Sequence, residues 1–274
     1  MVAIFKLIKY ITKVLFVSIF CINQIYAWNA LGHRLIVQIA VDNLRPTIVK
    51  KLEQLNHNAL INTAPWLDSL RYLHKNNLQE LHYIDLPFTE DNTQLVKPQI
   101  NNAVTAINQS TAILSNLAMN NAKRRFALRV LIHVVGDLHQ PLHAISRFSK
   151  RYPNGDHGGN LVLIMTNKMG DNLHRYWDNG GGFLLSKHKV ANAELRKMAH
   201  KLESKYPCYK IDRSYSQNIV MTWALESFRL ARDKAYKVSY GLYPNPKYQS
   251  MIKNITQQRL AIAGCRLAWL LNMK

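Results

Sequence analysis

The stretch KRRFALRVLIHVVGDLHQPLH, residues 123–143, decides how this chain folds. Apolar residues recur in it every three or four positions as far as Leu138, which predicts an amphipathic helix that ends there. Pro141 closes the helix because proline lacks the backbone N–H that a helix interior uses. His133 and Asp137 are four positions apart, so their side chains project from one face of the helix, about 6 Å from each other. The stretch therefore predicts a helix that presents a nitrogen and an oxygen ligand side by side.

The same helical spacing recurs through most of the chain. Helices are predicted for residues 31–40, 44–55, 101–117, 123–138, 191–202, 217–235 and 248–271. Residues 152–177 are irregular and rich in glycine, with one short strand predicted at 160–165. No internal repeat, low-complexity segment or linker divides the chain. The predicted fold class is therefore all-α, a single helical domain with long functional loops.

Residues 1–27 are predicted to be a signal peptide rather than part of this domain. Their first half is basic and free of acids, residues 14–22 form an apolar run of about nine, and Ala27 fits the position before a cleavage site. The run is shorter than the roughly 20 apolar residues of a spanning helix, although a membrane anchor is the alternative interpretation. Cleavage would make Trp28 the first residue of a secreted or periplasmic chain, 28–274, with no membrane association.

The chain is strongly basic, with 36 Lys and Arg against 16 Asp and Glu and a formal charge of +20. Removing the three lysines of the predicted signal peptide leaves 20 − 3 = +17. A field of this sign favours polyanionic partners such as nucleic acid, anionic lipid or acidic surfaces, without choosing among them.

Two cysteines, Cys208 and Cys265, lie beyond the predicted signal peptide. In an oxidising compartment they form one disulfide or remain as buried thiols. Neither has a second cysteine or a histidine beside it at the spacing of a zinc site.

His174 and Asp178 repeat the four-residue spacing of the first pair. Imidazole and carboxylate both bind zinc, so two such pairs are suitable chelators. A single pair of this kind is more often a surface ion pair or a hydrogen-bonded histidine, so neither pair is decisive alone. His139 lies on another side of its helix and is expected to pack or hydrogen-bond. The histidines expected to be solvated are His57, His74, His188 and His200, while His157 in a glycine-rich loop stays open.

The case for a metal site is stronger when the candidate residues are considered together, because they occur in a series of short segments along the chain. These are Trp28 and His33; Trp66-Leu67-Asp68 with Arg71; His82-Tyr83-Ile84-Asp85; His133 to His143; Gly155-Asp156-His157-Gly158-Gly159-Asn160; and His174-Arg175-Tyr176-Trp177-Asp178. This set resembles the S1/P1 family of single-strand-specific zinc nucleases, which yield 5′-nucleotides. It is similar, more distantly, to the zinc-dependent phospholipases C, which share the fold. The resemblance runs from Trp28 to Asp178, and the C-terminal third adds mainly helices.

The resemblance implies three zinc ions as cofactors. The first would be held by Asp68, His82, His133 and Asp137. The second would take the α-amino nitrogen and carbonyl oxygen of Trp28 together with His33, and would share Asp137 as a bridge. The third would be held by His143, His174 and Asp178. An aspartate at 178, where the phospholipases carry glutamate, favours the nuclease branch.

The resemblance also implies roles beyond the metal. Asp85 would orient or deprotonate the attacking water as the catalytic residue, although a loop or capping acid is the alternative. Tyr83 would stack on a base, unless it is an ordinary packed aromatic. Asn160 would contact phosphate or base. Four cations near the motifs either guide a phosphate backbone or are solvated surface charge: Lys150, Arg151, Lys168 and Arg175.

The expected function is thus an exported endonuclease that degrades single-stranded DNA and RNA, with nucleotides as products and 3′-nucleotidase activity in addition. Paired zinc ions would lower the pKa of water and polarise the phosphoryl group. The alternative enzyme is a zinc-dependent phospholipase C, for which Phe148 and Tyr152 are the candidate lipid-facing residues. A non-catalytic zinc-binding or nucleic-acid-binding protein is the alternative of another class. Family members often carry more cysteines, so metal is expected to contribute a larger share of stability here.

Overall fold

The computed structural model describes residues 28–70, 78–186, 188–211, 218–239 and 241–273. The predicted signal peptide, Arg71, His74 and the predicted helix start at Gln217 lie outside the described residues. The division into a signal peptide, 1–27, and one domain, 28–274, stays a prediction.

Helices make up most of the described chain, which confirms the all-α prediction. They are α2 (Ala30–Asp42), α3 (Pro46–Asn56), α4 (Leu60–Thr63), α5 (Trp66–Ser69), α6 (Ala103–Ser115), α7 (Asn121–Leu138), α8 (Leu173–Asp178), α9 (Asn192–Lys205), α10 (Ile219–Asp233) and α11 (Pro246–Asn272). Short 3-10 turns connect them at η3 (Glu80–His82), η4 (Pro141–Ala144), η5 (Gly180–Gly182), η6 (Cys208–Lys210) and η7 (Ala235–Lys237). Each predicted helix is present, with ends that move by at most three residues. Local capping explains such shifts: the Asn120 side chain accepts from the amide of Lys123, so α7 begins before its apolar repeat.

Four short strands complete the structure. β1 (Pro87–Thr89) pairs in parallel with β2 (Ser146–Phe148), and β3 (Leu163–Asn167) pairs antiparallel with β4 (Gly170–Asn172). The strand predicted at 160–165 therefore starts three residues late. The reason is a turn, because the backbone N–H and side-chain amide of Asn160 both donate to the carbonyl of His157.

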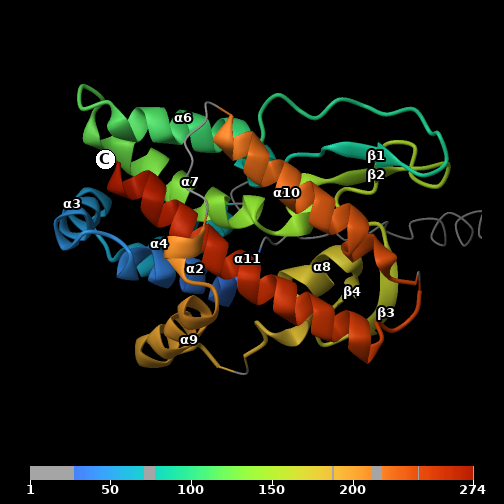
Figure 1. The fold of residues 1–274 in the computed structure, drawn as a ribbon. Coiled ribbons are helices and arrows are strands. Elements are labelled where there is room, and N and C mark those ends of the chain that lie inside the picture. Colours follow the sequence, from blue (N-terminus) through green and yellow to red (C-terminus); the bar gives the residue numbers. More distant parts are fainter. Residues whose placement is uncertain (1–27, 71–77, 187, 212–217, 240, 274) are drawn as a thin grey trace, which may run out of the picture.

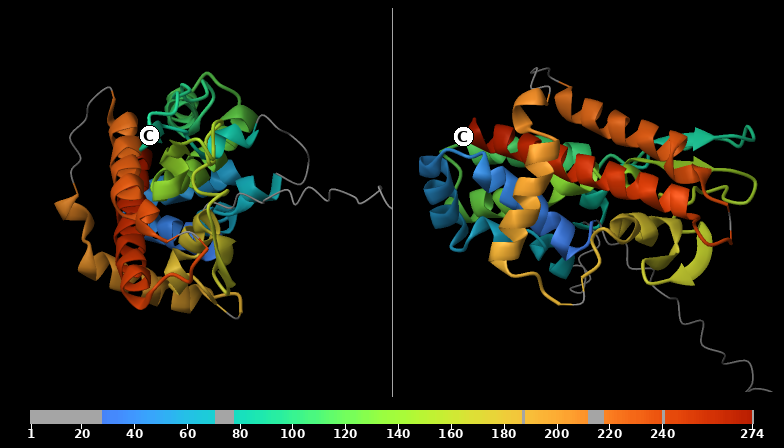
Figure 2. Two further views of the ribbon diagram at one scale, coloured as in Figure 1. Left: turned by 90° about the vertical axis from the view of Figure 1, so that its right-hand side faces the viewer. Right: turned by 60° about the horizontal axis from the view of Figure 1, so that its bottom comes forward.

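Helix α7 runs through the middle of the molecule. It packs against α6 and α2, while α10 and α11 cross in front of it in Figure 1. The left view in Figure 2 shows α10 and α11 along one edge of the molecule, with α2 and α7 beside them. Every residue from 130 to 146 is buried. The segment that carries His133, Asp137 and His143 is therefore inside the protein rather than on its surface.

Two glycines let α2 approach its neighbours closely. A Cβ at Gly264 of α11 would lie 2.6 Å from the Cβ of Ile39, and one at Gly136 of α7 would lie 3.0 Å from the Nδ1 of His33. A Cβ at Gly264 would therefore require α2 and α11 to shift, and one at Gly136 would require the His33 or Ile36 side chain to move by a few tenths of an ångström. These contacts place α2, and with it His33, directly against α7.

Within the part of the chain that the structure describes, no helix combines the length and apolar character needed to cross a membrane.

Cys208 of η6 and Cys265 of α11 form a disulfide, with Cα atoms 5.3 Å apart. Of the two outcomes that the sequence left open, the structure therefore has the bond. The bridge joins residues 57 positions apart and holds η6 on α11.

Reducing this disulfide should lower the free energy of unfolding by about 4 kcal/mol, the entropy that a loop of this length regains in the unfolded chain. Urea unfolding with and without reductant measures the change. The double variant Cys208→Ser/Cys265→Ser is the control, since its unfolding midpoint should not respond to reductant. Equal midpoints for the wild-type protein in both conditions would contradict the prediction.

Candidate metal centre

Asp137, near the end of α7, is the point on which three histidines converge. Its carboxylate oxygens lie 3.2 Å from the Nε2 of His33, 2.8 Å from the Nδ1 of His82 and 3.3 Å from the Nε2 of His133. His33 comes from α2 and His82 from η3, whereas His133 is one turn earlier on α7. All four side chains are buried. The helical spacing predicted from the sequence is thus completed by two residues that are distant in the chain.

Asp68 of α5 closes this group on its outer side. Its Oδ1 lies 3.5 Å from the Nε2 of His133 and 4.0 Å from the Nδ1 of His82. Its side chain retains 14% exposure, in contrast to the fully buried Asp137. The group therefore meets the surface at Asp68.

A second group forms where η4 meets α8. The Nε2 atoms of His143 and His174 are 3.0 Å apart, and the Oδ1 of Asp178 lies 3.9 Å and 3.6 Å from them. All three side chains are buried. The i, i+4 pair on α8 and the histidine after Pro141 therefore meet, as the family resemblance implied.

Backbone carbonyls set the orientation of three of the imidazoles. Each ring lies with its Nδ1 within 2.7–2.8 Å of a carbonyl oxygen: His133 at Ala64, His143 at His82, and His174 at Gly158. A carbonyl can only accept, so each Nδ1 carries the proton and each Nε2 is left to face its group. Metal-bound histidines are held in this way in proteins.

Gln140 is a site residue that the sequence reasoning missed. Its side-chain amide donates to the Oδ1 of Asp178 at 2.7 Å, and its Oε1 accepts from the amide of Leu142 at 2.6 Å. It is fully buried. The sequence did offer one sign of this role, namely that Gln140 lies between His133 and His143. A buried side-chain amide at that position must form hydrogen bonds with neighbouring polar groups.

Trp28 packs against the end of α7 that carries Asp137. Its side chain is fully buried, and its indole N–H donates to the carbonyl of Gly136 at 3.1 Å, one residue before Asp137. The next amide, that of Asn29, donates to the carbonyl of Asp178 at 3.2 Å. The Asn29 side chain also caps α2. The Trp28 side chain and the Asn29 amide are thereby bonded to backbone carbonyls beside Asp137 and at Asp178.

The arrangement fits a bound cation. The Nε2 of His33 and the Oδ1 of Asp137, although 3.2 Å apart, and the Nε2 of His133 are buried, and none of these three atoms has a partner in hydrogen-bonding geometry. Buried polar atoms rarely stay unsatisfied in native proteins, and a metal ion satisfies all three types of ligand atom. Three sets of side chains have ligand atoms within 4.8 Å of one another: His33, Asp68 and His133; His82, His133 and Asp137; and His143, His174 and Asp178. All eight side chains predicted as ligands belong to these sets.

The charges in the first group agree with this. Burial alone would favour a neutral Asp137, but His133, His33 and His82 hold the pKa of its carboxyl well below the ordinary value. Burial likewise lowers the pKa of His133, yet Asp137 and Asp68 outweigh it and raise the pKa to about 9. The group therefore keeps an ionised carboxylate in the interior, which attracts positive charge.

Asp85 and Tyr83 follow His82 along the segment beside the second group. The amide of Ile84 between them donates to the carbonyl of His143 at 2.8 Å, which ties this segment to η4. Burial and the nearby Asp156 raise the pKa of Asp85 to about 7. Tyr83 is half-buried.

Asn160 is buried in the glycine-rich loop. Its side-chain amide donates a hydrogen bond to the carbonyl of His157 at 2.7 Å, while its Oδ1 is buried without a hydrogen-bond partner. The neighbouring Asp156 organises this loop by accepting from Arg147, Gly159 and Tyr236.

The remaining histidines behave largely as the sequence indicates. His139 is buried, with its Nδ1 2.7 Å from the carbonyl of Val135 and its Nε2 3.0 Å from Arg266, so the packing prediction is confirmed. His57, His188 and His200 are exposed as predicted. His157, for which the sequence made no prediction, is exposed as well. The four cations near the motifs are also exposed, which leaves both of their predicted roles open: Lys150, Arg151, Lys168 and Arg175.

Replacing Asp85 with asparagine should stabilise the metal-free protein above neutral pH. The carboxyl has a pKa of 3.8 in its ordinary state and about 7 when folded. Stability is therefore lost as pH rises between these values, because the unfolded chain ionises first. Asparagine does not ionise, so the variant should gain roughly 1–4 kcal/mol at pH 8 and less as pH falls towards 4.

Urea unfolding in the presence of a chelator, repeated from pH 5 to pH 8, measures this difference. A difference between variant and wild type that does not change with pH would contradict the assigned pKa.

Comparison with known proteins agrees with this geometry. A family model described as S1/P1 Nuclease matches residues 28–274. Endonuclease 2 of Arabidopsis thaliana is 27% identical over 91% of this chain and 91% of its own length. Nuclease P1 of Penicillium citrinum is 27% identical over 88% of this chain and 95% of its own length. Nuclease S1 of Aspergillus oryzae is 27% identical, in a match that spans 60% of each protein. Since the family model spans the whole chain beyond residue 27, this chain belongs to the S1/P1 nuclease family.

Proposed function

We propose that this chain is a zinc-dependent endonuclease that hydrolyses single-stranded DNA and RNA to 5′-nucleotides and also acts as a 3′-nucleotidase. The observation that carries the proposal is the largely buried His/Asp groups, in which three sets of three residues each bring their ligand atoms within 4.8 Å of one another. Membership of a zinc-dependent nuclease family supports the same chemistry.

The proposed ligands divide among three zinc ions. Asp68, His82, His133 and Asp137 would hold the first, and His143, His174 and Asp178 the third. The second would use His33, a shared Asp137 and the α-amino nitrogen and carbonyl oxygen of Trp28. The hydrogen bonds of Trp28 and Asn29 support this, because they join residues 28 and 29 to the carbonyl of Gly136, next to Asp137, and to the carbonyl of Asp178.

Zinc ions held by these residues would supply positive charge that lowers the pKa of water and polarises a phosphoryl group. The protein contributes the groups around that charge. Asp85, with a pKa near 7, is suited to orient a water molecule or to take its proton at neutral pH. Gln140 fixes the direction of the Asp178 carboxylate through its 2.7 Å hydrogen bond.

Substrate contacts are proposed for two residues. Tyr83, half-buried beside Asp85, would stack on an unpaired base, a contact worth about 1–3 kcal/mol that tolerates any sequence. The buried Oδ1 of Asn160 would accept a hydrogen bond from a base. Export through the predicted signal peptide and the charge of +17 after its removal support an extracellular or periplasmic enzyme that meets polyanions.

A zinc-dependent phospholipase C is the second candidate, and one surface favours it. Leu161, Leu163 and Met165 are exposed on alternate positions along and before β3, and Leu242 is exposed beside them. Such a stripe could meet lipid. Phe148 and Tyr152, the residues that the sequence suggested for this role, are both buried and cannot form that surface.

Hydrolysis of single-stranded DNA and of phosphatidylcholine, measured with the same zinc-loaded preparation, separates the two enzymes. Faster turnover of phosphatidylcholine would overturn the nuclease proposal. Turnover of neither substrate would favour a non-catalytic zinc-binding protein.

The role of the chain start is tested by comparing protein that begins at Trp28 with protein that carries one extra residue before it. The native start should bind about three zinc ions and cut single-stranded DNA, while the extended form should lose one zinc and its activity, because its Trp28 nitrogen is an amide. Zinc content and DNA hydrolysis are the measurements.

Protein with one extra residue at the C-terminus is the matched control and should behave like the native form. Chelation should abolish activity and lower the melting temperature of both active forms. If the extended form keeps its zinc and activity, Trp28 is not a ligand.

A further inference from the structure

The helix face of α7 that carries the buried His133 continues towards the N-terminus of the helix with a row of two partly exposed arginines. Arg125 and Arg129 precede His133 by eight and four positions, so all three lie along one face of the helix. Arg129 and Arg125 are partly exposed, whereas His133 is buried. The row therefore leads from the metal centre outward along the surface.

Two aromatic rings accompany this row. The guanidinium of Arg129 lies over the Trp66 ring, 5.0 Å from its centroid, and Phe126 meets the same ring edge-on at 5.8 Å. Phe126 is 44% exposed. Trp66 stands only two residues before Asp68, the outermost member of the first His/Asp group. Rings and guanidinium thus form one cluster beside the metal centre.

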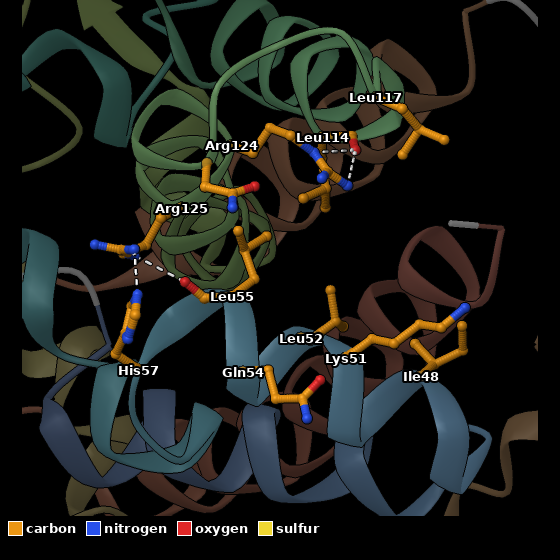
Figure 3. Close-up of a pocket in the computed structure, with 11 residues that line it drawn as sticks. Ile48, Lys51, Leu52, Gln54, Leu55, His57, Leu114, Leu117, Arg124 and Arg125 are labelled. Carbon is orange, nitrogen blue, oxygen red and sulfur yellow. Dashed lines mark hydrogen bonds between the residues drawn. The ribbon is translucent and has the colours of Figure 1, made fainter.

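The row ends at a cavity of about 430 Å³ between α3 and the α6–α7 connection. Figure 3 shows Arg124 and Leu114 on one wall and Lys51 and Leu52 on the other. Arg125 stands at the edge, where its Nε donates to the carbonyl of Leu55 at 2.8 Å. Among the described residues that line the cavity, four are basic or imidazole and none is acidic.

We propose that this α7 surface, made of Trp66, Phe126, Arg129 and the cavity with Lys51 and Arg124, binds the part of a single-stranded nucleic acid that lies away from the cleaved bond. The inference rests on the proposed nuclease function and adds to it a second contact for longer strands.

The chemistry of the surface matches this ligand. Single-strand binding sites combine cations that follow the backbone with aromatic rings on which bases stack. The exposed Phe126 ring beside Trp66 supplies the stacking element. In the cavity, leucine side chains form an apolar surface that a base can contact. Lys51 and Arg124 can form ion pairs with the phosphates on either side of that base.

The dimensions give a length threshold. Eight residues of α-helix separate Arg125 from His133, a rise of about 12 Å. At about 3.4 Å per phosphate in a stacked strand, this distance requires about four nucleotides. A dinucleotide held at the metal centre therefore cannot reach the cavity, but a 20-mer can.

Steady-state hydrolysis by two zinc-loaded variants tests the proposal: Lys51→Ala/Arg124→Ala, which alters the cavity, and Phe126→Ala, which removes the exposed ring. For a single-stranded 20-mer, KM should rise about five- to tenfold in the first and about threefold in the second, with kcat unchanged. Hydrolysis of a dinucleotide should stay at the wild-type rate in both. The dependence of log KM on log salt should weaken by about 1.4 in the double variant, because two phosphate contacts are lost.

The matched control is Lys205→Ala/Lys210→Ala, which removes two charges from a different basic cavity lined by α9, α10 and α11. It should leave KM for the 20-mer unchanged. An equal rise in KM in this control, or no rise in the α7 variants, overturns the proposal. A parallel loss on the dinucleotide also overturns it, because the variants would then disturb the metal centre itself.

Binding separates this inference from the proposed function. Fluorescence anisotropy of a labelled 20-mer is measured on the Asp85→Asn background, with and without the Lys51→Ala/Arg124→Ala change. If the wild-type protein cuts no nucleic acid but the 20-mer still binds five- to tenfold more weakly after that change, the function is wrong and the surface stands. If cutting is observed and binding does not weaken, the surface is wrong and the function stands.

Discussion

The carboxylate of Asp137 is the interaction on which the rest of the structure depends. Three imidazoles from three separate elements lie within 3.3 Å of it, in an interior that excludes water. An ionised carboxylate in such a place is costly unless positive charge compensates it. The helices α2 and α7 and the turn η3 are therefore brought together around a charge that only a cation or protonated histidines can balance.

Contacts from α11 hold the end of α7 that carries the metal-ligand residues. Arg266 donates to the Nε2 of His139, and Arg259 donates to its carbonyl at 3.2 Å, immediately after the ligand-bearing part of α7. Both arginines are held by Glu226 of α10. The C-terminal helices, which contribute no proposed ligand, thus fix the end of α7 from the far side.

Sequence alone was sufficient for the helices and for the two pairs spaced by four residues, because both follow from local periodicity. It was not sufficient to join Asp68 and His82 to His133, since they are 65 and 51 residues away in the chain and no local rule links them. The family resemblance supplied that grouping. The sequence also did not predict the hydrogen bonds that orient the site, which are made by the carbonyls of Ala64 and Gly158 and by the amide of Gln140. These contacts join segments that become adjacent only after folding. The strand predicted at 160–165 began late for a similar reason, namely the turn at Asn160.

Helix α2 is confined by glycine on two sides, Gly136 of α7 and Gly264 of α11. The same helix carries His33, so its lateral position is part of the metal geometry. Most buried aliphatic residues can be exchanged for others of similar volume. A methyl group at Gly264 would instead push against the backbone of α2, and one at Gly136 would displace the His33 ring or the Ile36 side chain by a few tenths of an ångström. These two positions should therefore be among the least substitutable in the protein, although neither glycine has a side chain that could touch metal or substrate.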